Sequence, residues 1–91
     1  MKVYEIEHDI CTLETGIMNY NLSLFSSKEN AIKTAQYYVR NLMGVRGYNE
    51  EEIDMEVKAL KEGRAAVFED FDMTEHTFYI SERTIHEEAI Q

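Results

Sequence analysis

The chain has 91 residues, of which 44% are hydrophobic and 30% are charged, and its formal net charge is −9. That length fits one domain around one core, and the apolar content is too high for a disordered polymer. No apolar run approaches the roughly 20 residues that span a bilayer, and the first ten residues lack the apolar region of a secretory signal. The single cysteine, Cys11, excludes an internal disulfide. We therefore expect one cytoplasmic domain over residues 1–91 that makes no membrane contact.

The negative charge belongs to one half of the chain. Residues 1–47 hold five basic and five acidic residues, whereas residues 48–91 hold four basic and thirteen acidic ones. The second half therefore carries the whole net charge. A function that depends on this charge is expected to lie in the second half.

The first quarter of the chain predicts a β-hairpin. Residues 2–10 alternate between apolar and acidic side chains, which is the period of a half-buried strand. A turn at residues 14–16 precedes residues 18–24, where apolar side chains again alternate with small polar ones. We expect these two strands to pair.

Two helices are predicted next. The first covers about residues 28–43, with Ser26 or Ser27 as its N-cap, Glu29 completing a capping box and Gly44 as a left-handed terminator. The second covers about residues 50–62, because Asn49 can cap it and Gly63 can end it. Its apolar stripe consists of Ile53, Val57 and Leu60.

Two short strands complete the prediction. Residues 65–71 and 76–82 are rich in β-forming side chains, and the polar residues 72–75 between them favour a turn. The element order is then ββααββ. We expect an α+β fold with a small antiparallel sheet and two helices on one of its faces.

Catalytic and metal-binding chemistry is not indicated. His8 and Cys11 have a spacing that two zinc ligands can have, but a strand directs them to opposite faces. Cys11 has acidic neighbours, which disfavour a nucleophilic thiolate and favour a structural role. Glu5 and Glu7 lie about 6.6 Å apart along a strand, and we interpret them as a solvated acidic face. We expect no enzyme activity, no metal and no cofactor.

All candidate binding residues except Tyr37 lie in the acidic half of the chain. Adjacent Tyr37 and Tyr38 cannot both face the core, so Tyr37 is expected to be exposed, together with Tyr48 in the loop between the helices. The carboxylates serve either as a solubilising surface or as imitations of nucleic-acid phosphates that bind a basic protein. The predicted partner-binding residues are Glu50, Glu51, Glu52, Asp54, Glu56, Glu69, Asp70, Asp72, Glu75, Tyr37 and Tyr48.

A resemblance adds to this interpretation. The strand–helix junction at residues 24–31 (LFSSKENA) and the closing strand Phe78-Tyr79-Ile80 look like those of many small bacterial and phage α+β domains. In size and acidity the chain is similar to phage-encoded inhibitors of host defence, of the anti-CRISPR or anti-restriction type. That similarity implies a protein that occludes the nucleic-acid-binding groove of a nuclease.

Two functional hypotheses follow. In the first, the chain is a non-enzymatic inhibitor whose acidic surface occupies a basic site on a nucleic-acid-handling protein, without binding nucleic acid itself. In the alternative, it is a self-associating structural or regulatory domain. Its homo-oligomer interface would then combine an exposed sheet edge with Tyr37, Tyr48 and Phe25.

Overall fold

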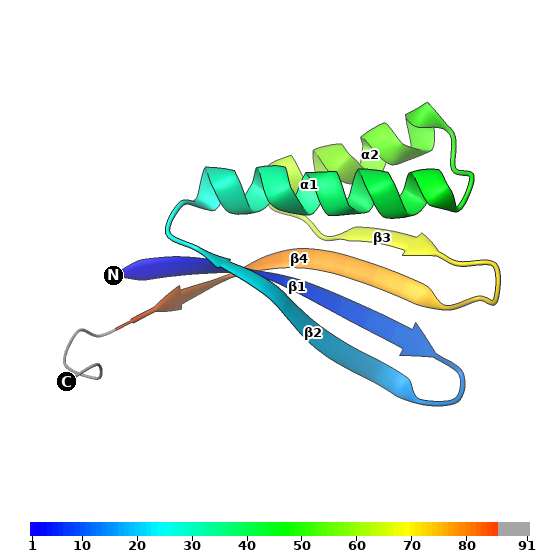
Figure 1. The fold of residues 1–91 in the computed structure, drawn as a ribbon, viewed down its shortest axis with the longest axis horizontal. Coiled ribbons are helices and arrows are strands. Elements are labelled where there is room, and N and C mark those ends of the chain that lie inside the picture. The colour runs from blue at the N-terminus through cyan, green and yellow to red at the C-terminus, as the bar shows by residue number, and fades with distance from the viewer. Residues whose placement is uncertain (86–91) are drawn as a thin grey trace.

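The computed structural model describes residues 1–85, and its elements follow the predicted order ββααββ. They are β1 (Lys2–Thr12), β2 (Gly16–Phe25), α1 (Lys28–Val45), α2 (Glu50–Lys61), β3 (Ala66–Glu69) and β4 (Glu75–Thr84). The strands form one antiparallel sheet in the spatial order β2-β1-β4-β3. Both helices cover the same face of this sheet (Figure 1). The predicted α+β class is confirmed. None of the described helices is long and apolar enough to cross a membrane.

The first two strands form the predicted hairpin, with one irregularity. Ile6 pairs with Ser23, but Glu7 pairs with Asn21, so Leu22 is an extra residue in β2. Such a β-bulge reverses the side-chain parity of the strand on either side of it. As a result Tyr20, like Ile6, faces the helices although it lies three positions, an odd number, from Ser23.

The start and end of α1 differ from the prediction. Ser27 is the N-cap, and its Oγ accepts the N–H of Asn30 at 3.3 Å. Asn30 is the third helical residue, so Glu29 stands one position too early and the predicted capping box is wrong. Gly44 lies inside the helix, and Gly47 (φ 83°) is the left-handed glycine after it.

The ends of α2 match the prediction. Asn49 Oδ1 accepts the N–H of Glu52 at 2.9 Å, and Glu52 Oε1 accepts the N–H of Asn49 at 3.1 Å. This reciprocal pair is a capping box. Gly63 follows the helix with φ 81°, a backbone conformation that glycine adopts without strain.

The β3–β4 connection is longer than predicted, because β3 ends at Glu69 and not at Phe71. Asp70 N–H donates to the Thr74 carbonyl at 2.8 Å, and Asp72 Oδ1 accepts the N–H of Thr74 at 3.1 Å. These bonds close a loop that already begins at Asp70. β4 in turn starts at Glu75 and continues to Thr84.

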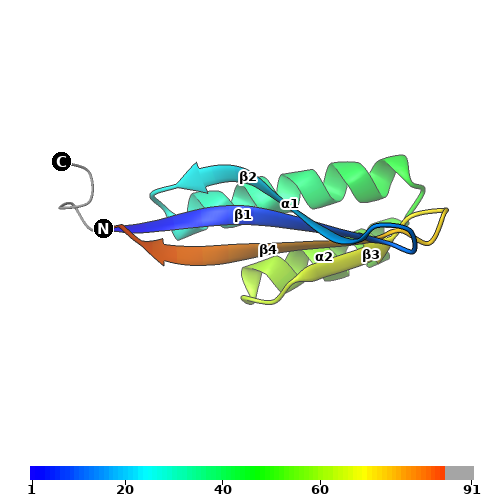
Figure 2. The same ribbon diagram turned by 90° about the horizontal axis from the view of Figure 1, so that it is seen from below.

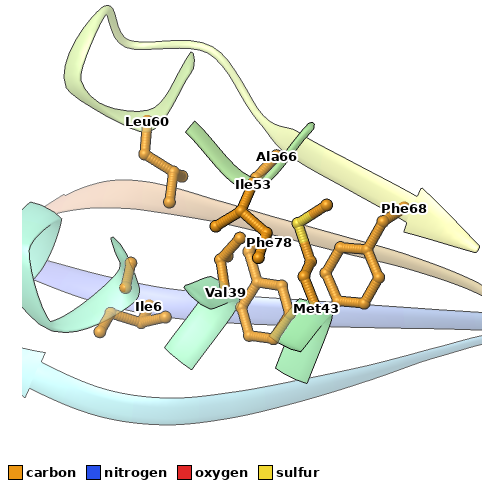
Figure 3. Close-up of a cluster of buried hydrophobic side chains, with 9 residues drawn as sticks. Ile6, Val39, Met43, Ile53, Leu60, Ala66, Phe68 and Phe78 are labelled. Atoms are coloured by element: carbon orange, nitrogen blue, oxygen red, sulfur yellow. The ribbon is translucent and has the colours of Figure 1, made fainter. Parts of the chain in front are cut away.

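The core lies between the covered face of the sheet and the two helices (Figure 3). Ile6 and Phe78 from the central strands are fully buried, as are Val39 on α1 and Leu60 on α2. Burying side chains of this size contributes roughly 1.5–3 kcal/mol each. Met43, Ile53, Ala66 and Phe68 complete the part of the cluster that joins α2 and β3 to the rest.

Within residues 1–85, both helices lie on one face of the sheet and none covers the other, which we call the uncovered face (Figure 2). Its side chains include Glu5, Glu7 and Asp9 from β1. Glu5 is only 7% exposed, and its Oε1 accepts a hydrogen bond from Arg83 on β4 at 2.9 Å. The expectation that Glu5 is solvated is therefore wrong, because a cross-strand arginine covers it.

Candidate functional site

The two acidic segments predicted from the sequence meet at one end of the molecule. The start of α2, the β3–β4 loop and the β1–β2 turn all lie at the end where α1 finishes (Figure 1). We call this region the acidic end. We define it by six carboxylates, Glu51, Glu52, Glu69, Asp70, Asp72 and Glu75.

A shallow pocket of about 370 Å³ lies between the two segments. It brings Glu52 of α2 next to Glu69 and Asp70, which follow it in the sequence by 17 and 18 residues. Such proximity is not visible from sequence spacing. The pocket is lined by Arg46, Gly47, Tyr48, Glu52, Glu69, Asp70 and Phe71.

Tyr48 fixes one wall of this pocket. Its hydroxyl donates to the Glu69 carbonyl at 2.5 Å and accepts the Glu69 N–H at 3.1 Å. Its ring lies edge-on to Phe68, with centroids 6.1 Å apart. Tyr48 is therefore partly buried against the core, and its predicted free exposure is wrong. Part of its surface still lines the pocket.

Asp70 and Arg46 form the best-shielded ion pair of the site. The Arg46 guanidinium lies 2.8 Å from Asp70 Oδ2, and both side chains are about one-fifth exposed. The hydrogen bond from Arg46, followed by that from the Phe71 N–H, holds the pKa of Asp70 below its usual value. Asp70 thus serves to fix the loop and offers a partner only part of its charge.

The loop also presents an exposed aromatic ring. Phe71 is 84% exposed beside the pocket, and its N–H donates to Asp70 Oδ1 at 2.9 Å. Hydrogen bonds from Thr74 lower the pKa of the Asp72 carboxyl. Asp72 therefore orders the turn that holds Phe71 out in solvent.

Three of the predicted binding acids on α2 have partners within the molecule. Arg40 of α1 contacts Glu50 at 3.3 Å and Asp54 at 2.9 Å. Glu56 Oε1 accepts the N–H of Val67 on β3 at 3.0 Å. These contacts join α2 to α1 and to β3, which explains the positions of these carboxylates without a partner.

Three of the remaining predicted acids, Glu51, Glu69 and Glu75, are exposed to solvent. The described residues provide no ion pair or side-chain hydrogen bond to any of these three carboxylates. Glu69 and Glu75 are opposed across β3 and β4. Two carboxylates in that position repel each other, so a cation that binds between them relieves an unfavourable contact.

Tyr37 is exposed as predicted, but it lies away from the acidic end. It is 65% exposed near the middle of α1, and the centroid of its ring lies 6.3 Å from that of the Tyr38 ring. It does not line the acidic pocket. The structure therefore brings Tyr48 to the acidic residues and leaves Tyr37 apart from them.

A histidine pair connects the pocket to the core, and sequence reasoning missed it. His8 Nε2 lies 2.9 Å from His76 Nδ1, and His76 Nε2 lies 3.4 Å from Asp70 Oδ2. His8 also stacks on Phe78, with centroids 4.0 Å apart. The signal in the sequence is parity, because His8 shares the apolar face of its strand with Ile6 and Ile10.

Burial, followed by the electrostatic effect of the neighbouring His76, lowers the pKa of His8 from 6.5 to about 4. Cys11 lies on the other face of β1, so it cannot join a site with His8. In residues 1–85, no three His, Cys, Asp or Glu side chains are placed to hold a common metal ion. Comparisons of the chain with protein-family models, curated proteins and solved structures gave no match.

Proposed function

We propose that the chain is a non-enzymatic protein-binding module that presents its acidic end to a basic site on a partner protein. The observation that supports this most is the pocket that gathers Glu52, Glu69 and Asp70 from two separate segments. The six carboxylates of the acidic end have one guanidinium among them, that of Arg46, which leaves this region at about −5. A field of that sign steers basic surfaces toward it.

Phe71 gives this surface the means to hold a cation as well as attract it. An arginine that enters the pocket from a partner meets carboxylates on its edges and an exposed aromatic face beside them. Guanidinium groups bind both, through charged hydrogen bonds and through cation–π contact. The expected contact is therefore an arginine of the partner between Phe71, Glu52 and Glu69.

The narrower form of the proposal concerns the kind of partner. A protein that handles nucleic acid carries basic side chains along the groove that binds phosphates. An acidic module seated there competes with nucleic acid and inhibits the protein. We propose such a groove, as in a CRISPR or restriction nuclease, as the partner of the acidic end.

The test is capture of binding proteins from a lysate of the native host, followed by affinity measurement with the purified partner. One variant combines Glu51→Gln, Glu69→Gln and Glu75→Gln, whose carboxylates have no ion pair or side-chain hydrogen bond within residues 1–85. We expect it to bind at least about tenfold more weakly, and wild-type affinity to fall when salt rises from about 50 to about 500 mM.

A matched control carries the same change of charge at the opposite end of the molecule (Figure 1). It combines Glu29→Gln, Glu62→Gln and Glu82→Gln, which lie beside surface lysines or arginines. We expect this control to keep wild-type affinity within about twofold. Equal losses in both variants, or binding that salt does not affect, would contradict the proposal. Failure of the chain to displace nucleic acid would contradict only its narrower form.

A further inference from the structure

The outer side of β2 is an open strand edge. β2 lies at the end of the sheet and pairs only with β1. In residues 1–85, no other backbone group or side chain is bonded to its outward amides and carbonyls. The bulge at Leu22 interrupts this row, so Gly16–Asn21 is its longest regular part.

This edge lacks the features by which proteins usually protect such strands. β2 contains no charged residue and no proline, although 30% of the chain is charged. Its apolar side chains are exposed on both faces, with Ile17 at 72%, Met18 at 46% and Tyr20 at 44%. The neighbouring carboxylates of Asp9 and Glu7 are bonded by Asn19 Nδ2, at 2.6 and 3.4 Å.

An apolar groove continues from this edge toward α1. It has a volume of about 480 Å³ and lies beside β2 on the face that the helices cover. Side chains that reach it from a neighbouring strand meet almost no charge. The groove is lined by His8, Leu22, Tyr38, Asn41, Leu42 and Phe78.

We propose that the Gly16–Asn21 segment of β2 pairs antiparallel with the same segment of a second copy of this chain. A register centred on Asn19 places Met18 opposite Tyr20 of the second copy on the covered face, and Ile17 opposite Asn21 on the uncovered face. A twofold axis produces this self-complementary contact. The four-stranded sheets of the two copies then become one sheet.

Charge favours β2 as the edge by which a second copy approaches. Two chains of net charge −9 repel each other, and β2 is the neutral edge. Pairing there places the two β4 strands, which carry Glu75, five strand spacings apart, roughly 24 Å at 4.8 Å per strand, and the two β3 edges farther still. That separation exceeds the Debye length of about 8–10 Å in physiological salt. The acidic ends are then screened from one another and stay accessible.

Sedimentation equilibrium of the full chain tests the proposal, from about 5 to about 500 µM. We expect a monomer–dimer equilibrium that tightens as salt rises, because salt screens the repulsion between copies. This salt dependence is opposite to that expected for partner binding by the acidic end. The two proposals can therefore fail independently.

Lysine substitutions locate the interface. Met18→Lys and Ile17→Lys place charges in the proposed strand pair, and each is expected to weaken dimerisation at least about tenfold. Met55→Lys is the matched control, because Met55 is 68% exposed on α2 and far from β2. Thermal unfolding of each variant shows that it is folded.

Hydrogen exchange supplies a second measurement on the unmodified chain. We expect amides in Gly16–Asn21 to become protected as concentration rises, while those in β3 do not change. A wild-type monomer at about 500 µM would overturn the proposal, and pairing of this edge with another protein would then be the remaining explanation. A dimer that neither β2 lysine weakens would also overturn it.

Discussion

At the β3 edge, the amides of Val67 and Glu69 are bonded by the side chains of Glu56 and Tyr48, whereas the outer row of β2 has no such partner in the described chain. Both strands lie at an edge of the same sheet. The carboxylate of Glu56 and the phenol of Tyr48, both from the acidic half of the chain, thus bond the outward amides of β3. At least one of the acidic residues in this half, Glu56, therefore has a structural role.

Core packing is expected to give the largest difference between the two edges. Phe68 on β3 is 4% exposed and lies in the core, whereas Leu24 on β2 is 56% exposed. We expect Phe68→Ala to lower the free energy of unfolding by about 3–5 kcal/mol and Leu24→Ala to change it by less than about 0.5 kcal/mol in the monomer. Urea unfolding at low protein concentration measures both. Comparable losses would mean that β2 is packed in a way the structure does not show.

Loss of one hydroxyl tests how far Tyr48 closes the β3 edge. Tyr48→Phe removes both hydrogen bonds to the Glu69 backbone, at an expected cost of about 1–2 kcal/mol. Tyr20→Phe on β2 is the control, because within residues 1–85 the hydroxyl of Tyr20 has no hydrogen bond except a long one to the Met18 sulfur, at 3.9 Å. We expect that change to stay within about 0.5 kcal/mol. We expect hydrogen exchange of the Glu69 amide to be faster in Tyr48→Phe than in the wild type, and unchanged in Tyr20→Phe. The same exchange rate in Tyr48→Phe and the wild type would contradict this role of Tyr48.

Acid is expected to lower the free energy of unfolding through His8, which lies on β1 beside His76 of β4. The pKa of His8 is 6.5 in the unfolded chain and about 4 in the folded one, so the unfolded state binds more protons between these values. Stability due to neutral His8 is therefore complete above pH 6.5, falls as the pH drops toward 4, and changes no further below that. Because His8 is only half-buried, we expect a loss of about 1–2 kcal/mol across this window.

The measurement for this effect is urea unfolding at about pH 7 and about pH 4.5. His8→Phe keeps a ring against Phe78 but cannot take up a proton. We expect the variant to lose less stability than the wild type over the same interval. An identical loss would assign the pH dependence to groups other than His8. Asp70 is not one of them, because its lowered pKa makes its own contribution disappear only below this interval.

The sequence predicted the architecture because local signals agree with it. Asn49 and Gly63 mark the two ends of α2 by their own backbone preferences. The alternation in β1 identifies the strand without knowledge of its neighbours. Errors occurred where two residues suit one role, as with Gly44 and Gly47 after α1. Only the packed structure determines which of the two is used.

The sequence identified the acidic residues of the site but not which of them lie together or have partners within the molecule. The contacts that assign structural roles to Glu56, Tyr48 and Asp70 join residues 11, 21 and 24 positions apart. Sequence periodicity contains no information at those separations. For the same reason it could not separate the carboxylates engaged within the molecule from those that remain free, Glu51, Glu69 and Glu75.

The bulge at Leu22 determines which face of the sheet each side chain of the following strand pairs occupies. Nine pairs, from Tyr4 with Phe25 to Thr12 with Gly16, enclose one unpaired residue, and the register around it decides which side chains between Gly16 and Asn21 face the helices. Pairing Leu22 opposite Glu7, without a bulge, would turn Met18 and Tyr20 outward and bring Asn19 and Asn21 onto the core side, whereas deleting Leu22 would keep every pair and both faces as they are. A one-residue slip of the register would thus exchange the two surfaces of this strand, whereas loss of the bulged residue would leave both in place.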